Sequence, residues 1–173
     1  MRADDAADAI MELAQERRQG VLDRLVEGQK TKILTLLGYH EATAGGLMGP
    51  DFLALSEDKT VGDAIQAVRS ATTHQPEALT MIHTVRGDGT LTGTLTLVRA
   101  LQAKSETLLR EAADPHLVVA SPGDDIITVT TRMADFNLLS LPVVDASNKM
   151  LGIVTVDDAL EAAIPRDWIR RRS

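Results

Sequence analysis

Short apolar runs separated by small polar residues give the second half of the chain its pattern. The clearest example is the stretch 141–162, with an apolar run at 141–144, a polar turn at 145–148 and a second apolar run at 150–154. A helical pattern follows from Thr155, with two aspartates in its first turn, where unpaired backbone N–H groups favour a carboxylate or a bound anion. This order predicts a strand, a hairpin turn, a second strand and a helix.

A weaker copy of the same unit occurs earlier in the chain. Its two strands are expected at 80–85 and 91–96, joined by a turn at 86–89. Within the second of these strands, Gly93 lies 59 residues before Gly152. The hairpin and the helix after it are therefore expected twice.

The strand that opens each copy has a different spacing. Residues 52–56 resemble residues 117–121 at a separation of 65, so the first copy contains six extra residues, which we place around 72–77. Each copy predicts strand, helix, strand, strand and helix. A period near sixty residues indicates two duplicated small domains packed together rather than a long solenoid.

The residues before the repeats have a helical pattern. Residues 1–37 predict short helices, with apolar stripes at 6–14, 21–26 and 33–37. A break rich in Gly and Pro follows, and we expect the glycine-rich segment 45–49 to be a linker and hinge.

The predicted fold class is α/β (α+β), a pair of duplicated domains preceded by a short all-helical segment. We place the helical segment at 1–44, the first domain at 45–106 and the second domain with its C-terminal tail at 107–173.

Composition excludes several classes of function. Aromatic residues make up only 2% of the chain and the net charge is −7, so neither a stacking platform for bases nor a basic footprint for nucleic acid is expected. The basic C-terminal end at 166–172 is too short to reverse this. We expect no nucleic-acid partner.

The chain has no cysteine, which excludes disulfides, thiolate metal sites and cysteine nucleophiles. Its start lacks the apolar core of a signal peptide, and no apolar run approaches the length of a membrane span. A cytoplasmic location is therefore expected. No glycine-rich phosphate loop, nucleophile elbow or histidine dyad is present, so we do not expect an enzyme.

Two motifs in the second repeat carry a family resemblance. The sequence Leu-Pro-Val-Val-Asp at 141–145, followed by Gly-Ile-Val-Thr-Val-Asp-Asp at 152–158, resembles a CBS domain, and the doubled unit resembles a tandem CBS pair. With the stretches 44–48 and 58–64, the chain is similar to the cytosolic part of MgtE-type magnesium transporters. The opening helices resemble the end of that family's N-terminal helical domain. The resemblance extends to about Ile164.

The CBS resemblance implies a site for an adenine nucleotide, ATP or AMP, at the Gly-x-x-Thr-x-x-Asp signature. In such modules the hydroxyl and the carboxylate bind the ribose and phosphate region. The residues that correspond here are Thr155 and Asp158, with Ser121 from the opening strand nearby. The alternative, left open, is that Thr155 and Asp158 only cap a helix.

The first repeat departs from this signature. Its corresponding residues are Gly93, Thr96 and Arg99, so an arginine stands where the signature has an aspartate. The change removes the acceptor for the ribose and supplies a cation. The resemblance therefore implies at most one nucleotide site in each chain, with Arg99 as a contact to phosphate.

The MgtE resemblance also implies regulatory Mg2+ bound by carboxylates of two domains. The candidate ligands are two pairs, each spaced by one helical turn: Asp158 with Glu161, and Asp4 with Asp8. The alternative for Asp4 and Asp8 is favourable charge at a helix N-terminus. Asn137 is a departure, because the family typically has an acidic residue before the Leu-Pro-Val-Val strand.

The basic C-terminal end is a second departure from the family, which continues into an acid-rich helix and a membrane domain. Either a soluble relative or the cytosolic part of a divergent transporter fits. In both cases the resemblance implies a regulatory domain for magnesium transport, which binds Mg2+, an adenine nucleotide or both and forms a homodimer through its CBS pair. The alternative is a CBS dimerisation and adaptor scaffold without a ligand.

Overall fold

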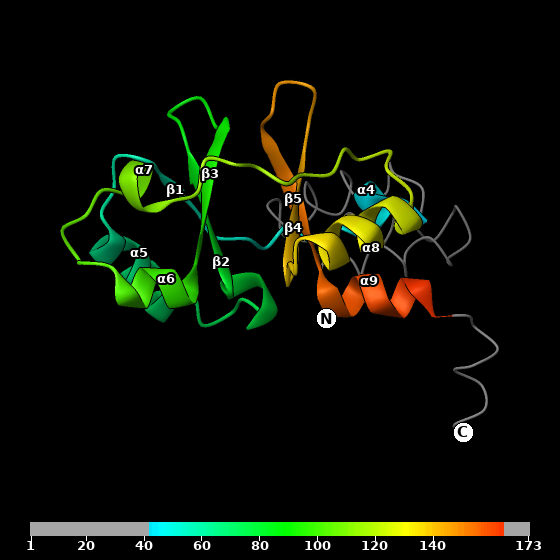
Figure 1. The fold of residues 1–173 in the computed structure, drawn as a ribbon, viewed down its shortest axis with the longest axis horizontal. Coiled ribbons are helices and arrows are strands. Elements are labelled where there is room, and N and C mark those ends of the chain that lie inside the picture. The colour runs from blue at the N-terminus through cyan, green and yellow to red at the C-terminus, as the bar shows by residue number, and fades with distance from the viewer. Residues whose placement is uncertain (1–41, 165–173) are drawn as a thin grey trace, which may run out of the picture.

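The structure is a computed structural model that describes residues 42–164, and it contains two repeats side by side (Figure 1). The predicted helices within 1–37, the carboxylates of Asp4 and Asp8, and the basic end lie outside the described residues. The elements of the first repeat are β1 (Ala54–Ser56), α5 (Val61–Ser70), the 3-10 helix Glu77–Leu79, β2 (Met81–Val85), β3 (Leu91–Thr96) and α6 (Leu97–Gln102). Those of the second are α8 (Ile126–Asp135), β4 (Ser140–Val144), β5 (Met150–Thr155) and α9 (Val156–Ala163).

Both repeats have the same strand pairing, and the predicted mixed α and β architecture is confirmed. In the first repeat β1 pairs in parallel with β2, and β2 pairs antiparallel with β3. In the second, β4 pairs antiparallel with β5, and Ala120 forms a parallel bridge to Val143 where the first repeat has β1. The two β-hairpins lie in the middle of the molecule, with α5 and α6 beside one and α8 and α9 beside the other (Figure 1).

The six extra residues predicted for the first copy lie in one connection. Residues 71–80 join α5 to β2, whereas residues 136–139 join α8 to β4. The longer connection holds the 3-10 helix, and Ala78 of that helix is buried. The predicted position of the insertion is therefore confirmed.

Two short helices exchange places between the repeats. Helix α4 (Ala44–Leu47) precedes the first repeat in the chain, but Ala44 and the C-cap residue Met48 are buried in the hydrophobic core of the second repeat. Helix α7 (Leu109–Ala112) precedes the second repeat, but Leu109 is buried in the core of the first. The predicted boundaries follow the sequence period, whereas the packing crosses them in both directions.

The backbone pairing shows the same exchange at equivalent positions. Gly49 pairs with Ile153 of β5, and Asp114 pairs with Thr94 of β3. The prediction that 45–49 forms a hinge is wrong, because this segment is bonded to β5 and Met48 is only 1% exposed.

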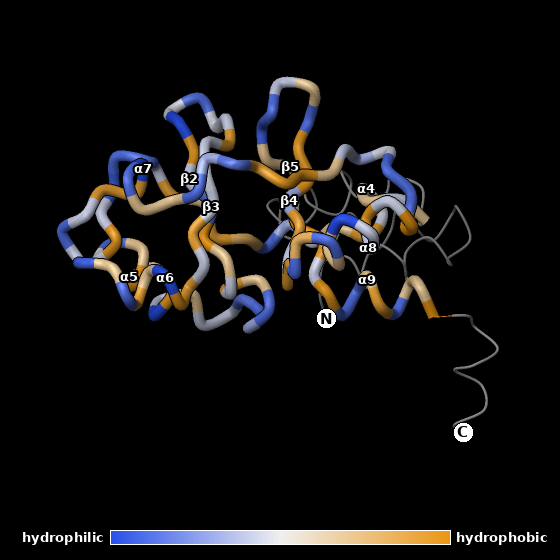
Figure 2. Tube along the Cα trace, viewed as in Figure 1, coloured by the Kyte–Doolittle hydropathy of each residue, from blue (hydrophilic) through white to orange (hydrophobic). Residues whose placement is uncertain are grey.

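The hairpins of the two repeats are joined at their turns. The N–H of Leu91 donates to the carbonyl of Asn148 at 2.9 Å, and the Asn148 amide donates to the Leu91 carbonyl at 3.0 Å. Asn148 has a φ of 58°, a left-handed conformation that asparagine tolerates better than most residues. The turns themselves are hydrophilic, while the strands below them are largely hydrophobic (Figure 2).

Candidate ligand-binding site

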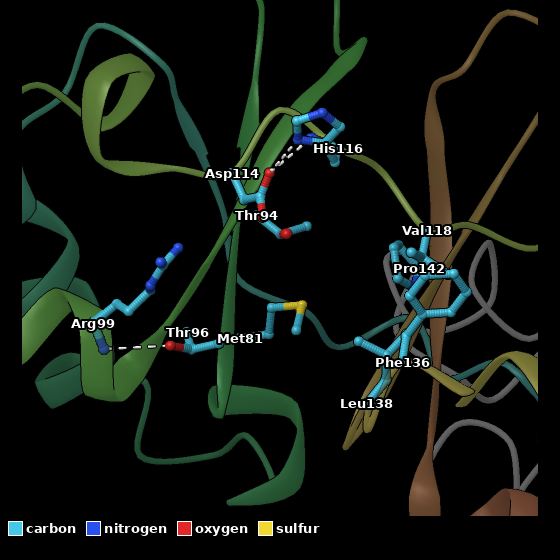
Figure 3. A pocket seen from close by; sticks show the side chains of 10 residues that line it. All are labelled: Met81, Thr94, Thr96, Arg99, Asp114, His116, Val118, Phe136, Leu138 and Pro142. Carbon is cyan, nitrogen blue, oxygen red and sulfur yellow. Dashed lines mark hydrogen bonds and ion pairs between the residues drawn. The ribbon is translucent and has the colours of Figure 1, made fainter. Parts of the chain in front are cut away.

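A cavity of about 480 Å3 lies between the two repeats. Ten side chains from both repeats and from the segment that joins them line it (Figure 3). They are Met81, Thr94, Thr96, Arg99, Asp114, His116, Val118, Phe136, Leu138 and Pro142. Its position at the junction of the repeats is typical of a ligand site.

The wall formed by the first repeat and the joining segment is mostly polar. Alternation along β3 places Thr94 and Thr96 on one face, opposite the buried Leu95. Thr96 caps α6, and its hydroxyl accepts a hydrogen bond from the N–H of Arg99 at 3.3 Å. The guanidinium of Arg99 therefore starts from a fixed backbone position at the edge of the cavity (Figure 3).

Asp114 and His116 complete the polar wall. The Oδ1 atom of Asp114 accepts from the backbone N–H of His116 at 2.9 Å and lies 3.0 Å from Nδ1 of its ring. The backbone N–H of His116, then its ring, and to a smaller extent the charge of Arg99, hold the pKa of Asp114 below its usual value. Asp114 is therefore a carboxylate at neutral pH.

The wall formed by the second repeat is apolar. Phe136 and Leu138 follow α8, and Pro142 lies on β4 (Figure 3). Phe136 is 57% exposed, although large aromatic residues are usually buried. Such a wall suits the face of a ring, and the opposite wall suits hydroxyl and anionic groups.

Three of the four residues predicted for a nucleotide lie away from this cavity. Arg99 lines it, whereas Thr155, Asp158 and Ser121 are not among its lining residues. The Thr155 hydroxyl donates to Oδ2 of Asp158 at 2.5 Å and makes no cap to the backbone. In this respect α9 differs from α6, where the equivalent threonine accepts from the backbone of Arg99.

The other predicted positions are dispersed. Ser121 is exposed, and its N–H donates to Oδ2 of Asp124 at 3.0 Å. Glu161 is exposed on α9, one turn beyond Asp158. Within residues 42–164 no group of three or more His, Asp or Glu side chains is placed to hold a metal ion. These two carboxylates therefore fit Mg2+ only with oxygen ligands from elsewhere, such as water.

Asn137 has a structural role that its sequence position did not reveal. It has a φ of 51° and follows α8, where its N–H donates to the carbonyl of Ala134. Asparagine is one of the few residues that adopt this left-handed conformation at low cost, and it commonly ends a helix.

Sequence reasoning missed most of the cavity. Thr94 could have been found, because it alternates with buried residues along the same strand as Thr96. Asp114, His116 and Phe136 lie in connections without periodicity, and only the packing of the repeats brings them together.

Comparison with known proteins gives a consistent family. The model of the CBS domain matches residues 109–164. The magnesium transporter MgtE of Thermus thermophilus is 35% identical over 163 residues, which are 91% of this chain and 36% of that protein. The MgtE of Enterococcus faecalis is 28% identical over 130 residues, or 75% of this chain and 28% of that protein. The chain thus spans about a third of the length of these relatives.

Solved structures agree with the sequence matches. The cytosolic domain of the Mg2+ channel MgtE, solved in complex with ATP, has a TM-score of 0.88 and 32% identity, over 93% of this chain and 66% of that one. The CBS pair domain of a Mg2+ transporter from Shewanella oneidensis has a TM-score of 0.73 at 17% identity, over 94% of each chain, which shows the shared fold. No helix within residues 42–164 is long and apolar enough to cross a bilayer. The chain belongs to the MgtE family, as a module of paired CBS domains.

Proposed function

We propose that this chain is the regulatory, ligand-sensing module of an MgtE-like magnesium transporter. In this proposal the module lies on the cytosolic side and acts by binding rather than by catalysis. It binds an adenine nucleotide, Mg2+ or both, and the bound ligand changes how its domains pack. A ligand has this effect only when its affinity differs between the two arrangements.

The observation that supports the proposal is the cavity between the repeats. Its walls come from both repeats and from the segment that joins them, so a bound molecule contacts all three. Its apolar and polar walls match the base and the ribose phosphate of a nucleotide. The neighbouring MgtE cytosolic domain was solved with ATP, which favours the same class of ligand here.

The proposed Mg2+ site has fewer of its ligands among the described residues than the nucleotide cavity has. Asp158 and Glu161 supply two carboxylates on one face of α9, and Asp4 and Asp8 are proposed as the second pair. When bound, Mg2+ would neutralise these acids and so reduce repulsion between the segments that contain them.

A titration of thermal stability tests the function. We expect ATP or AMP, each at about 100 times its dissociation constant, to raise the stability of the chain by about 2.7 kcal/mol. For a chain of this size, that gain corresponds to a rise of roughly 5–10 °C in the melting temperature. MgCl2 is titrated alone and with each nucleotide, and NaCl at matched ionic strength is the control.

The outcomes separate the hypotheses. A rise with nucleotide supports a nucleotide sensor, and a rise with MgCl2 beyond that with NaCl supports a magnesium sensor. A flat response to every ligand contradicts both and favours the adaptor scaffold.

We also propose that the module forms a homodimer through α6 and α9. Leu101 and Leu160 occupy equivalent positions in the two repeats and are 62% and 56% exposed. Val98 and Ile164 are also exposed, at or next to these helices. Two equivalent apolar helix faces suit a two-fold interface between copies.

Replacement of both leucines tests the dimer. We expect the wild-type chain to sediment at twice its 18.6 kDa mass. The double variant Leu101→Glu, Leu160→Glu should sediment as a monomer with an unchanged circular dichroism spectrum, because it places charges in the interface. Ile127→Glu, on the exposed side of α8, is the matched control and should remain dimeric. A monomeric wild-type chain, or a dimeric double variant, would contradict the proposal.

A further inference from the structure

The polar groups of the cavity are arranged differently from the signature of the second repeat. There the helix-start threonine donates to an aspartate, Asp158, three residues on. In the first repeat the equivalent helix begins with Thr96 and has Arg99 at that position, at the edge of the cavity. A cation thus occupies the place that the signature gives to a carboxylate.

The guanidinium of Arg99 is available to a ligand. It makes no ion pair with any residue in the range 42–164, although its charge contributes to the low pKa of Asp114. Arg99 and Asp114 therefore attract each other electrostatically but form no direct ion pair. Arginine binds phosphate oxygens through two parallel hydrogen bonds. A carboxylate at this position would instead repel the phosphate.

Asp114 supplies the carboxylate that the helix start lacks. Among the described residues that line the cavity it is the one acid. Its Oδ1 atom is held by the backbone N–H of His116, and the ring Nδ1 donates to the same oxygen when it carries the proton. The other oxygen, Oδ2, remains as an acceptor for the two neighbouring hydroxyl groups of a ribose.

We propose that Asp114 binds the ribose hydroxyls and Arg99 binds the phosphate of a nucleoside 5′-phosphate in this cavity, with the base against the wall that contains Phe136. The assignment rests on the proposed nucleotide function and specifies it further. It makes the cavity selective for phosphorylated nucleosides over nucleosides, and for ribose over deoxyribose.

Isothermal titration calorimetry with AMP, adenosine and 2′-deoxyadenosine 5′-monophosphate tests the two contacts separately. For the wild-type chain we expect AMP to bind roughly 10- to 100-fold more tightly than adenosine, because a hydrogen bond to a charged group is lost with the phosphate. Arg99→Ala should abolish this difference by weakening AMP alone. Arg69→Ala, on the exposed side of α5, is the matched control and should bind as the wild type does.

The ribose contact has its own comparison. The wild-type chain should prefer AMP to the deoxy compound by about tenfold. Asp114→Asn should lose this preference while it keeps the preference for AMP over adenosine. Asparagine retains an oxygen acceptor for His116, so the fold of the segment should remain intact.

The failures are distinguishable. If the wild-type chain binds neither AMP nor adenosine, the nucleotide function itself is wrong. If it binds AMP but Arg99→Ala weakens AMP and adenosine equally, or Asp114→Asn keeps the ribose preference, the function stands and the assignment of contacts is overturned.

Discussion

Gly152→Ala is expected to destabilise the protein by about 3 kcal/mol, the upper part of the range for overpacking a core. A Cβ atom on Gly152 would lie 2.7 Å from the carbonyl oxygen of Gly49 and 3.0 Å from Cγ of Met48. The oxygen belongs to backbone that is hydrogen-bonded to β5, and Met48 is buried, so neither moves away at low cost. Gly152 is thus required because the segment that follows α4, at Met48 and Gly49, packs directly against it.

Urea denaturation of matched variants measures this effect. Gly123→Ala is the control, because its Cβ would have no neighbour within 4 Å, and its stability should change by less than about 0.5 kcal/mol. Gly93→Ala should fall between the two, since its Cβ would lie 2.9 Å from the side-chain oxygen of Thr84 and 3.0 Å from Cβ of Ala113, but 3.1 Å from the nearest backbone oxygen, that of Asp114. Equal stability of Gly152→Ala and Gly123→Ala would contradict the role of the exchanged segment.

The second large effect is a loss of stability in weak acid caused by His83. This side chain is fully buried in β2, and neither ring nitrogen has a hydrogen-bond partner. Burial lowers the pKa of His83 from 6.5 to about 4. The unfolded chain therefore binds a proton between these two pH values and the folded chain does not, so stability is complete above pH 6.5 and falls as the pH decreases towards 4. The expected loss is about 3 kcal/mol.

His83→Leu separates this effect from other titrations. The variant should show a flat stability between pH 6.5 and 4, and at pH 7 it should be at least as stable as the wild type, because an unsatisfied polar ring is replaced by an apolar group. His116→Ala, at an exposed position, should keep the wild-type pH dependence. Aspartates with a lowered pKa, such as Asp63, lose their contribution mainly as the pH falls through their usual pKa of 3.8, so they affect only the acid end of this window. An unchanged pH profile in His83→Leu would show that another group is responsible.

The parts of the fold that depend on neighbouring residues in the sequence were predictable. Alternation in the hairpins located β2 to β5, and the separations of Gly93 from Gly152 and of 52–56 from 117–121 located the insertion. The exchange of α4 and α7 was not predictable, because each helix has only four residues. The partner strand of α4, β5, also lies about a hundred residues further along the chain. A short apolar segment such as 44–48 suits the core of either repeat equally well.

The site was predictable only in part for the same reason. Arg99 was identified because it interrupts a motif, and a departure from a motif is visible in one sequence. Phe136 and His116 have no motif of their own, and they line the cavity only because the two repeats pack side by side. Whether Thr155 and Asp158 bind a ligand stays a prediction.

The exchange of the short helices also determines the mechanical connectivity of the module. The chain enters the described region at α4 and leaves it at α9, and both helices are anchored on the second repeat. A force applied between these two ends is transmitted from Gly49 to Ile153 through their two backbone hydrogen bonds. From Ile153 it follows β5 into α9. The first repeat lies outside this path and does not transmit the force between the two ends. It therefore influences the ends of the module through the interface that it shares with the second repeat, where the cavity lies.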